Sequence, residues 1–276
     1  MNKEHISKKN LLIIWLCLIA VLTAAIFISG LPEGEKHESI TEVMRDGVLH
    51  ETSKINLLGL EVNPAVVSAF CVTGILLLLA AAFRVFVYPK FTTVPGKLQC
   101  VLEALVEFFL DMAKKNSPHL PGPCGKYIFA AGCYIFFSTL FELLGFQAVN
   151  TGGVSIALPA PISDINAAIA MGVTSYLFIL IGGIRHNGAK GALSVLKDFS
   201  LPISMSFRLF GALLSGLLVT ELVYYYIALS FVLPVIVGVL FTLLHALIQT
   251  YVLATLVSIF YGEAVEPSAK KYKIIE

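Results

Sequence analysis

The chain has 276 residues, of which 57% are hydrophobic and 13% are charged, and its mean hydropathy is +0.86. Soluble domains carry nearly twice this charged fraction, so the composition excludes an ordinary globular core and predicts an all-α integral membrane protein. The net charge of +1 says little by itself. No metal, cofactor or nucleic-acid partner is expected.

Residues 1–30 form a basic start followed by nineteen apolar residues, Leu11 to Ser29. This pattern is typical of a retained membrane anchor or of a signal peptide. The long apolar run and the lack of a clear A-x-A site favour the anchor. Residues 31–64 carry seven acidic and three basic side chains and are expected to lie outside the membrane as a polar segment. The apolar run 65–83 then spans inward and stops before Arg84.

Residues 94–116 show apolar side chains at helical spacing, with Glu103, Glu107 and Asp111 opposite them. The pattern predicts an amphipathic helix that lies on the cytoplasmic membrane surface or docks on other protein. A loop rich in Pro and Gly ends this helix. The next predicted span, 127–149, carries one charge, Glu142, and leads into an uncharged loop, 150–163.

The sequence PISDIN opens another inward span, which ends at Ile184, and Ser163 or Asp164 is suited to cap it. From residue 203 to about 231 a helix would measure about 43 Å, longer than the bilayer core of about 30 Å, so it must tilt or bend. Pro234 and Gly238 are expected to break the apolar run before a last long segment returns to Tyr261. A polar cytoplasmic tail is expected from Gly262 onward.

These segments predict six membrane spans and one amphipathic helix, with both termini in the cytoplasm. The distribution of the 19 Lys and Arg residues sets this orientation: three lie between residues 30 and 64, one is Arg208, and fifteen lie in the segments assigned to the inside. Unusually short, interrupted helices in an inverted repeat are not visible, which argues against the commonest transporter designs.

Arg208 is the one charge in the 22 residues 199–220. A charge at this depth is costly and needs a carboxylate partner or water, and intramembrane charges are functional by default. Four small residues follow on its side of the predicted helix: Gly211, Ala212, Ser215 and Gly216. Such a smooth strip would let a helix of another subunit, carrying the missing carboxylate, pass closely.

The last span places Thr242, His245 and Gln249 in a polar stripe at positions i, i+3 and i+7. Glu221 lies thirteen residues after Arg208, about 220° around the same helix, so it faces a different side. We expect Glu221 to lie in a wet crevice that reaches the outside. His245 can equally be a hydrogen-bonded packing residue.

The outer ends of two spans supply further polar candidates. Glu142 and Asp164 are positioned to extend the crevice, and Asn166 lies beside Asp164. For Asp164 the pattern favours helix capping over a place in an ion path.

Five blocks together resemble subunit a of bacterial F-type ATP synthases: VPGKLQ (94–99), FELLG (141–145), PISDIN (161–166), SFRLFG (206–211) and IQTYVLATLVSIFYGEAVE (248–266). The resemblance covers residues 60–266 in order and spacing. It implies that residues 65–266 are an ion-translocating domain, with 267–276 as the tail, in a bacterial inner membrane. It also implies that Arg208 is the stator arginine facing the c-ring, that Gln249 is its partner, and that the last two helices form a steeply tilted hairpin.

The implied partners are the c-ring, the subunit b peripheral stalk and the rest of the ATP synthase, and the chain itself is a non-catalytic subunit. Two positions depart from the family pattern: Ala212 replaces the usual Asn, and Leu217 stands where a carboxylate or histidine is common. The family's histidine or glutamate site on the last helix corresponds to Thr242. The proton-entry route is therefore expected to be rebuilt around Glu221 and His245.

Two other functions fit the apolar spans. A secondary transporter or channel would use Arg208 to bind an anion and would work without a c-ring. A passive membrane scaffold would leave Arg208 without a purpose. The sequence leaves open whether protons or sodium ions pass, because the ion-binding carboxylate lies on another chain.

Overall fold

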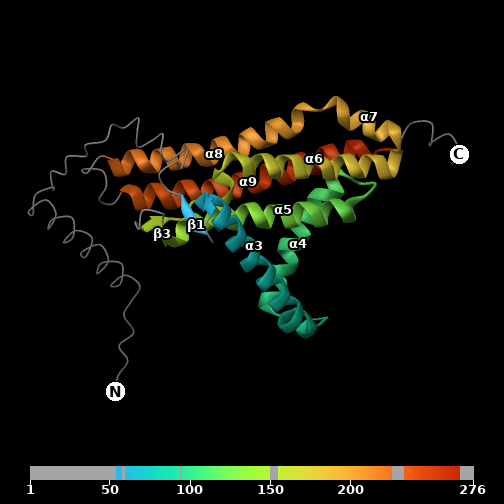
Figure 1. Cartoon of the computed structure of the whole chain (residues 1–276). Coiled ribbons are helices and arrows are strands. Elements are labelled where there is room, and N and C mark those ends of the chain that lie inside the picture. The colour runs from blue at the N-terminus through green and yellow to red at the C-terminus, as the bar shows by residue number, and fades with distance from the viewer. Residues whose placement is uncertain (1–53, 58–59, 94, 150–154, 226–232, 268–276) are drawn as a thin grey trace, which may run out of the picture.

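The structure is a computed structural model that describes residues 54–57, 60–93, 95–149, 155–225 and 233–267. Long helices make up most of it (Figure 1). The β-structure of the described chain is two short antiparallel hairpins, β1 (Ile55–Leu57) with β2 (Leu60–Val62) and β3 (Gln147–Val149) with β4 (Ser155–Ala157). The predicted all-α membrane class is confirmed.

Four long helices run side by side as an elongated bundle (Figure 1). They are α5 (Pro121–Phe141), α6 (Ile165–Asn187), α8 (Ser200–Tyr225) and α9 (Leu233–Val265). Apolar side chains fill the space between them, and Ile128, Ile135 and Val257 are fully buried. Glycines let the helices approach closely, since a methyl group on Gly182 would overlap the ring of Tyr261. The bundle is thus a rigid support for the polar residues on α8 and α9.

The helices α3 (Pro64–Ala82) and α4 (Lys97–Asn116) leave the bundle obliquely and approach each other away from it (Figure 1). The predicted amphipathic helix is confirmed as α4. Phe109 and Ala113 dock it on α5, while Leu98 and Val101 nearer its start are exposed. One half of α4 therefore packs on protein, and the other half presents an apolar surface.

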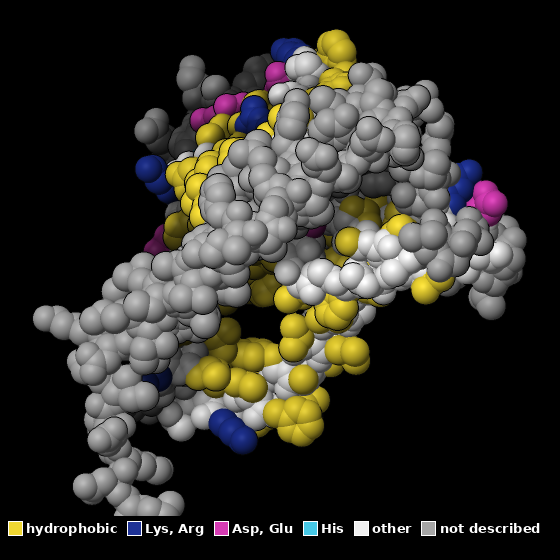
Figure 2. Space-filling view, turned by 90° about the vertical axis from the view of Figure 1, so that its left-hand side faces the viewer, with side chains coloured by type: hydrophobic (Ala, Val, Ile, Leu, Met, Phe, Trp, Pro, Cys, Tyr) yellow, Lys and Arg dark blue, Asp and Glu magenta, His cyan; other side chains and the backbone are white. Residues whose placement is uncertain are grey.

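Apolar side chains cover much of the described exterior. Leu77, Leu78 and Leu79 of α3 are 57–72% exposed, and Figure 2 shows further apolar groups across one face. Four helices among the described residues are long and apolar enough to cross a membrane, or five if α7 (Ala189–Lys197) and α8, which meet at 50°, form one bent span. The first of the six predicted spans, Leu11 to Ser29, lies outside the described residues, as do 31–53 and the tail from 268.

Several predicted boundaries are wrong. The span expected at 127–149 begins at Pro121 and ends at Phe141, followed by a single 3₁₀ turn, Glu142–Leu144. Proline is well suited to the first turn of a helix, because that turn does not need its missing N–H. Residues 147–149 are the strand β3, and 155–157 of the expected loop are its partner β4.

The last two helices also differ from expectation. Helix α8 begins at Ser200, three residues before the predicted start, and residues 226–231 of the predicted helix lie outside the described chain. Gly238 does not break the apolar run: α9 is continuous from Leu233, with Pro234 in its first turn. The polar tail expected from Gly262 begins later, because α9 continues to Val265 and buries Ala264 and Val265.

A short helix that the sequence pattern does not predict, α7, follows α6. Gly188 joins the two with φ of +62°, a left-handed conformation that glycine adopts without strain. Gly183 and Gly191 then bring the backbones of α6 and α7 into direct contact, since a methyl group on Gly191 would overlap the carbonyl of Gly183. After α7 the chain bends by 50° into α8.

Candidate functional site

Arg208 lies on the exposed edge of α8. Leu209 and Leu213, about 100° and 140° around the helix from Arg208, are buried on the side of α8 that faces the bundle. Among the residues that the structure describes, the guanidinium makes neither an ion pair nor a hydrogen bond. The chain thus leaves this positive charge available to a group outside itself.

The four small residues after Arg208 divide into two pairs. At 100° per residue, Gly211 and Ser215 lie about 60° and 20° to one side of the arginine, and Ala212 and Gly216 lie about 40° and 80° to the other. Gly211 and Ser215 are exposed, and a methyl group on Gly211 would meet no atom within 4 Å. Ala212 and Gly216 are half-buried. The open strip beside Arg208 is therefore narrower than the sequence suggested.

Gly216 faces α9. A methyl group built on it would lie 3.5 Å from Nδ1 and 3.6 Å from Cε1 of His245. The half-buried imidazole also lies beside Phe241, with ring centroids 5.9 Å apart. Gly216 therefore leaves room for a methyl group, but not for a larger side chain, beside His245.

The predicted stripe of Thr242, His245 and Gln249 lies on one continuous helix, α9. Gln249 is 6% exposed, and its Oε1 has no hydrogen-bond partner within the described ranges. Because burying an unpaired amide is unfavourable, this oxygen is a strong candidate to accept a hydrogen bond from water or from a guanidinium.

The two helices are antiparallel, which sets the order of these groups along the bundle (Figure 1). Gly216 and His245 are opposite each other. Arg208 is eight residues from that level along α8, about 12 Å, and Gln249 is four residues from it along α9, about 6 Å in the same direction. Gln249 thus lies at a level between His245 and Arg208. Glu221 lies on α8 about 20 Å from Arg208 along the helix axis, and the structure describes its backbone but not its side chain.

Asp164 is a helix cap, as predicted. Its Oδ1 accepts hydrogen bonds from the backbone N–H groups of Asn166 (2.7 Å) and Ala167 (3.3 Å), and its Oδ2 accepts one from Nδ2 of Asn63 (2.7 Å). Asn63 in turn caps α3 by accepting from the N–H of Ala65. With three donors bound, this carboxylate is committed to holding the starts of α3 and α6 together. Asn166 is exposed, and Glu142 is half-buried in the turn after α5.

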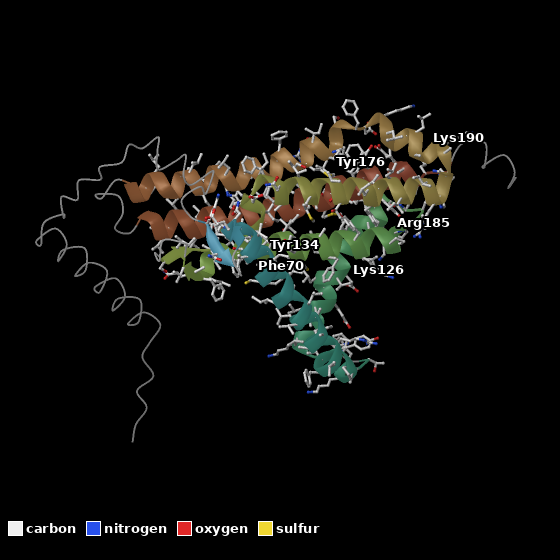
Figure 3. All side chains as sticks on the ribbon, viewed as in Figure 1. Phe70, Lys126, Tyr134, Tyr176, Arg185 and Lys190 are labelled. Carbon is white, nitrogen blue, oxygen red and sulfur yellow. The ribbon has the colours of Figure 1, made fainter. Side chains whose placement is uncertain are left out.

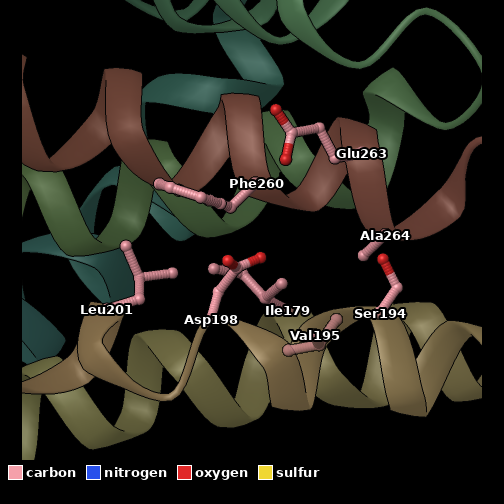
Figure 4. A pocket seen from close by; sticks show the side chains of 8 residues that line it. All are labelled: Ile179, Ser194, Val195, Asp198, Leu201, Phe260, Glu263 and Ala264. Carbon is pink, nitrogen blue, oxygen red and sulfur yellow. The ribbon is translucent and has the colours of Figure 1, made fainter.

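A second polar feature lies where α7, the start of α8 and the end of α9 meet (Figure 4). It is a pocket of about 10 Å³, room for about one water molecule, and Ser194, Asp198, Leu201 and Glu263 are among its lining residues. Leu201 is seven residues, or nearly two turns, before Arg208. The sequence alone does not point to Glu263, because the polar segment GEAVE is typical of the start of a tail.

The geometry combines an exposed arginine on an apolar helix, a buried amide and an imidazole on the neighbouring antiparallel helix, and an acid-lined pocket at the start of α8. The family model described as ATP synthase A chain matches residues 66–262, more than half of the chain. The matched region includes all of α8 and most of α9, with Arg208, His245 and Gln249, and it ends just before Glu263. The chain therefore belongs to the ATP synthase A chain family, the family of subunit a in the membrane sector of F-type ATP synthases.

Proposed function

We propose that this chain is the stator subunit that passes ions between the two sides of a bacterial inner membrane while the c-ring turns, and that Arg208 separates its two half-channels. The observation that carries the proposal is the state of Arg208: exposed, on the outer edge of α8, and without an ion pair among the described residues. A positive charge without an ion pair in its own chain suits a carboxylate that pairs with it only transiently.

The chemistry follows from the difference between charged and neutral carboxyl groups in lipid. A rotor carboxylate crosses hydrocarbon only when it is neutralised, because a bare charge there is heavily penalised. Near Arg208 the guanidinium favours the ionised form, so the carboxylate releases its ion and pairs transiently with the arginine. An ion from the other half-channel then restores the neutral form, and the fixed positive charge keeps ions from passing straight between the channels. Each charge gains about 2.3 kcal/mol per 100 mV.

The outer half-channel would follow the boundary between α8 and α9. Glu221 lies toward the outer end, His245 lies beside Gly216, and Gln249 is closest in level to Arg208. The unpaired Oε1 of Gln249 supports a role as an acceptor along this route. Thr242 lies one turn before His245 and is half-buried. Glu142 and Asn166 are assigned to the outer mouth by position alone.

The inner half-channel would open through the pocket that Asp198 and Glu263 line. Two carboxylates attract cations to this mouth, and Leu201 lies between the pocket and Arg208 on the same side of α8. In this assignment both termini are cytoplasmic, and a peripheral stalk of subunit b holds the chain against the ring.

The test is Arg208→Lys, because a compact ammonium cannot reproduce the planar guanidinium fork. In inverted membrane vesicles the variant complex is expected to assemble and to lose ATP-driven ion pumping. Arg185→Lys, which changes an exposed arginine at the end of α6, is the matched control and should pump normally. Normal pumping by the Arg208→Lys complex would refute the proposal.

A further inference from the structure

An apolar groove of about 390 Å³ lies where α4 diverges from α5 and α9. Its walls include Leu105 and Phe108 of α4, Gly132 and Cys133 of α5, and Leu247 and Tyr251 of α9. The hydroxyl of Thr250, which also lines the groove, already donates a hydrogen bond to the carbonyl oxygen of Gly132 (3.3 Å). The volume lies in the range of about 300–1,000 Å³ that is usual for ligand pockets. An apolar chain fits this groove better than a polar ligand does.

Two lysines lie beside one end of the groove. Lys115 is seven residues after Phe108 on α4, and Lys126 is seven residues before Cys133 on α5. Seven residues make nearly two turns, so each lysine shares a face with a groove residue and lies about 10 Å from it along the helix. Both are exposed, and neither forms an ion pair with any residue in the described ranges.

The same end of the bundle carries other cations. Figure 3 shows Lys126 at the end where Arg185 and Lys190 also lie. On α5 the exposed residues Lys126 and Ala130 continue, one turn at a time, into Cys133 at the groove. An apolar groove that leads to positive charge at the membrane surface matches an anionic amphiphile.

We propose that the groove holds an acyl chain of an anionic phospholipid, whose phosphate lies within reach of Lys115 and Lys126. A basic residue near the surface attracts anionic lipid, and the groove adds apolar contact for the chain. A transmembrane helix fits less well. An α-helix is about 10 Å wide, so one turn of it would already fill the 390 Å³ of the groove. This lipid site is independent of the ion path, so either proposal can fail without the other.

The test uses the complete complex in phosphatidylcholine nanodiscs, with phosphatidylglycerol that carries a photoreactive diazirine on its acyl chain. Cross-linked peptides are identified by mass spectrometry. We expect labelling of the α4, α5 and α9 segments that line the groove, and stronger labelling than with a phosphatidylcholine probe of the same structure. Exchanging either Lys115 or Lys126 for Gln should reduce phosphatidylglycerol labelling by about fivefold. Lys190→Gln, at the same end of the bundle but on α7, should leave it unchanged.

A second pair of variants tests the groove itself. Cys133→Trp fills the groove and should abolish labelling there, whereas Ile181→Trp, on an exposed position of α6, should not. Equal labelling by the two probes, or unchanged labelling in the lysine variants, would overturn the proposal. A photoreactive amino acid at position 133 that cross-links to another protein subunit instead of lipid would also overturn it.

Discussion

The imidazole of His245 on α9 lies against Gly216 on α8, so closely that one added methyl group would touch its ring at 3.5 Å. That distance is an ordinary van der Waals contact. Alanine therefore fits at this position, but a larger side chain requires the imidazole to move. The pair thus offers a direct way to displace His245 without changing its chemistry.

Gly216→Leu is expected to slow ATP-driven pumping severalfold, because overpacking forces a neighbour out of place at a cost of about 1–3 kcal/mol. Gly216→Ala should pump at close to the normal rate. The measurement is pumping in inverted vesicles, corrected for the amount of assembled complex. If leucine at this position were as active as alanine, His245 would have no place in the path.

Gln249→Leu separates stability from function. Removing a buried amide whose Oε1 has no partner in the described chain should raise the free energy of unfolding by about 1–3 kcal/mol. Pumping should nevertheless fall, because the acceptor near Arg208 is lost. Ser138→Ala is the control: its hydroxyl is also buried and lacks a partner in the described residues, but it lies on α5. This control should gain stability and keep its activity, and a fully active Gln249→Leu complex would exclude Gln249 from the path.

The acid-lined pocket can be tested with cysteine labelling. In a chain whose five native cysteines are replaced by alanine, Ser194→Cys places a thiol in the pocket. A membrane-impermeant maleimide added to inverted vesicles should modify this thiol and block pumping. The control is Leu193→Cys. Leu193 is 61% exposed and lies outside the pocket lining, so a cysteine at this position should be modified without loss of pumping. Full activity of the modified Ser194→Cys complex would remove the pocket from the inner half-channel.

Close helix packing predicts a stability difference between two glycines. Gly182→Ala would overlap the ring of Tyr261, which is buried and stacked on Phe178, and should destabilise the chain by about 1–3 kcal/mol. Gly238→Ala meets no atom within 4 Å and lies inside α9, so it should be neutral or stabilising by up to about 1 kcal/mol. Thermal unfolding in detergent measures both, and equal melting temperatures would contradict the packing described for α6 and α9.

Much of this arrangement follows from local rules. Residue spacing alone puts Thr242, His245 and Gln249 on one side of a helix, and the structure has them on one helix. The carboxylate of Asp164 caps α6 because Asp at that position can accept from the next free N–H groups. These features depend on a few neighbouring residues, and so the sequence suffices to predict them.

Other features depend on which elements meet. The angle of Gly216 from Arg208 was predictable, but whether that side faces lipid, another subunit or α9 depends on packing between distant segments. The same limit applies to α7, whose fold-back rests on the contact between Gly183 and Gly191. Glu263 cannot be assigned from the sequence, because the segment after Tyr261 is mostly polar and is typical of a tail. Only the packing of α9 shows that its neighbours Ala264 and Val265 are buried.

The bond between Asn63 and Asp164 joins residues 101 positions apart, each at the first turn of its own helix. It forms only when α3 and α6 begin on the same side of the bilayer. During insertion, an inverted α6 would leave the Asn63 amide without this acceptor and strand the Asp164 carboxylate on the far side. The shared cap therefore favours the arrangement in which α3 and α6 begin at the same end of the bundle.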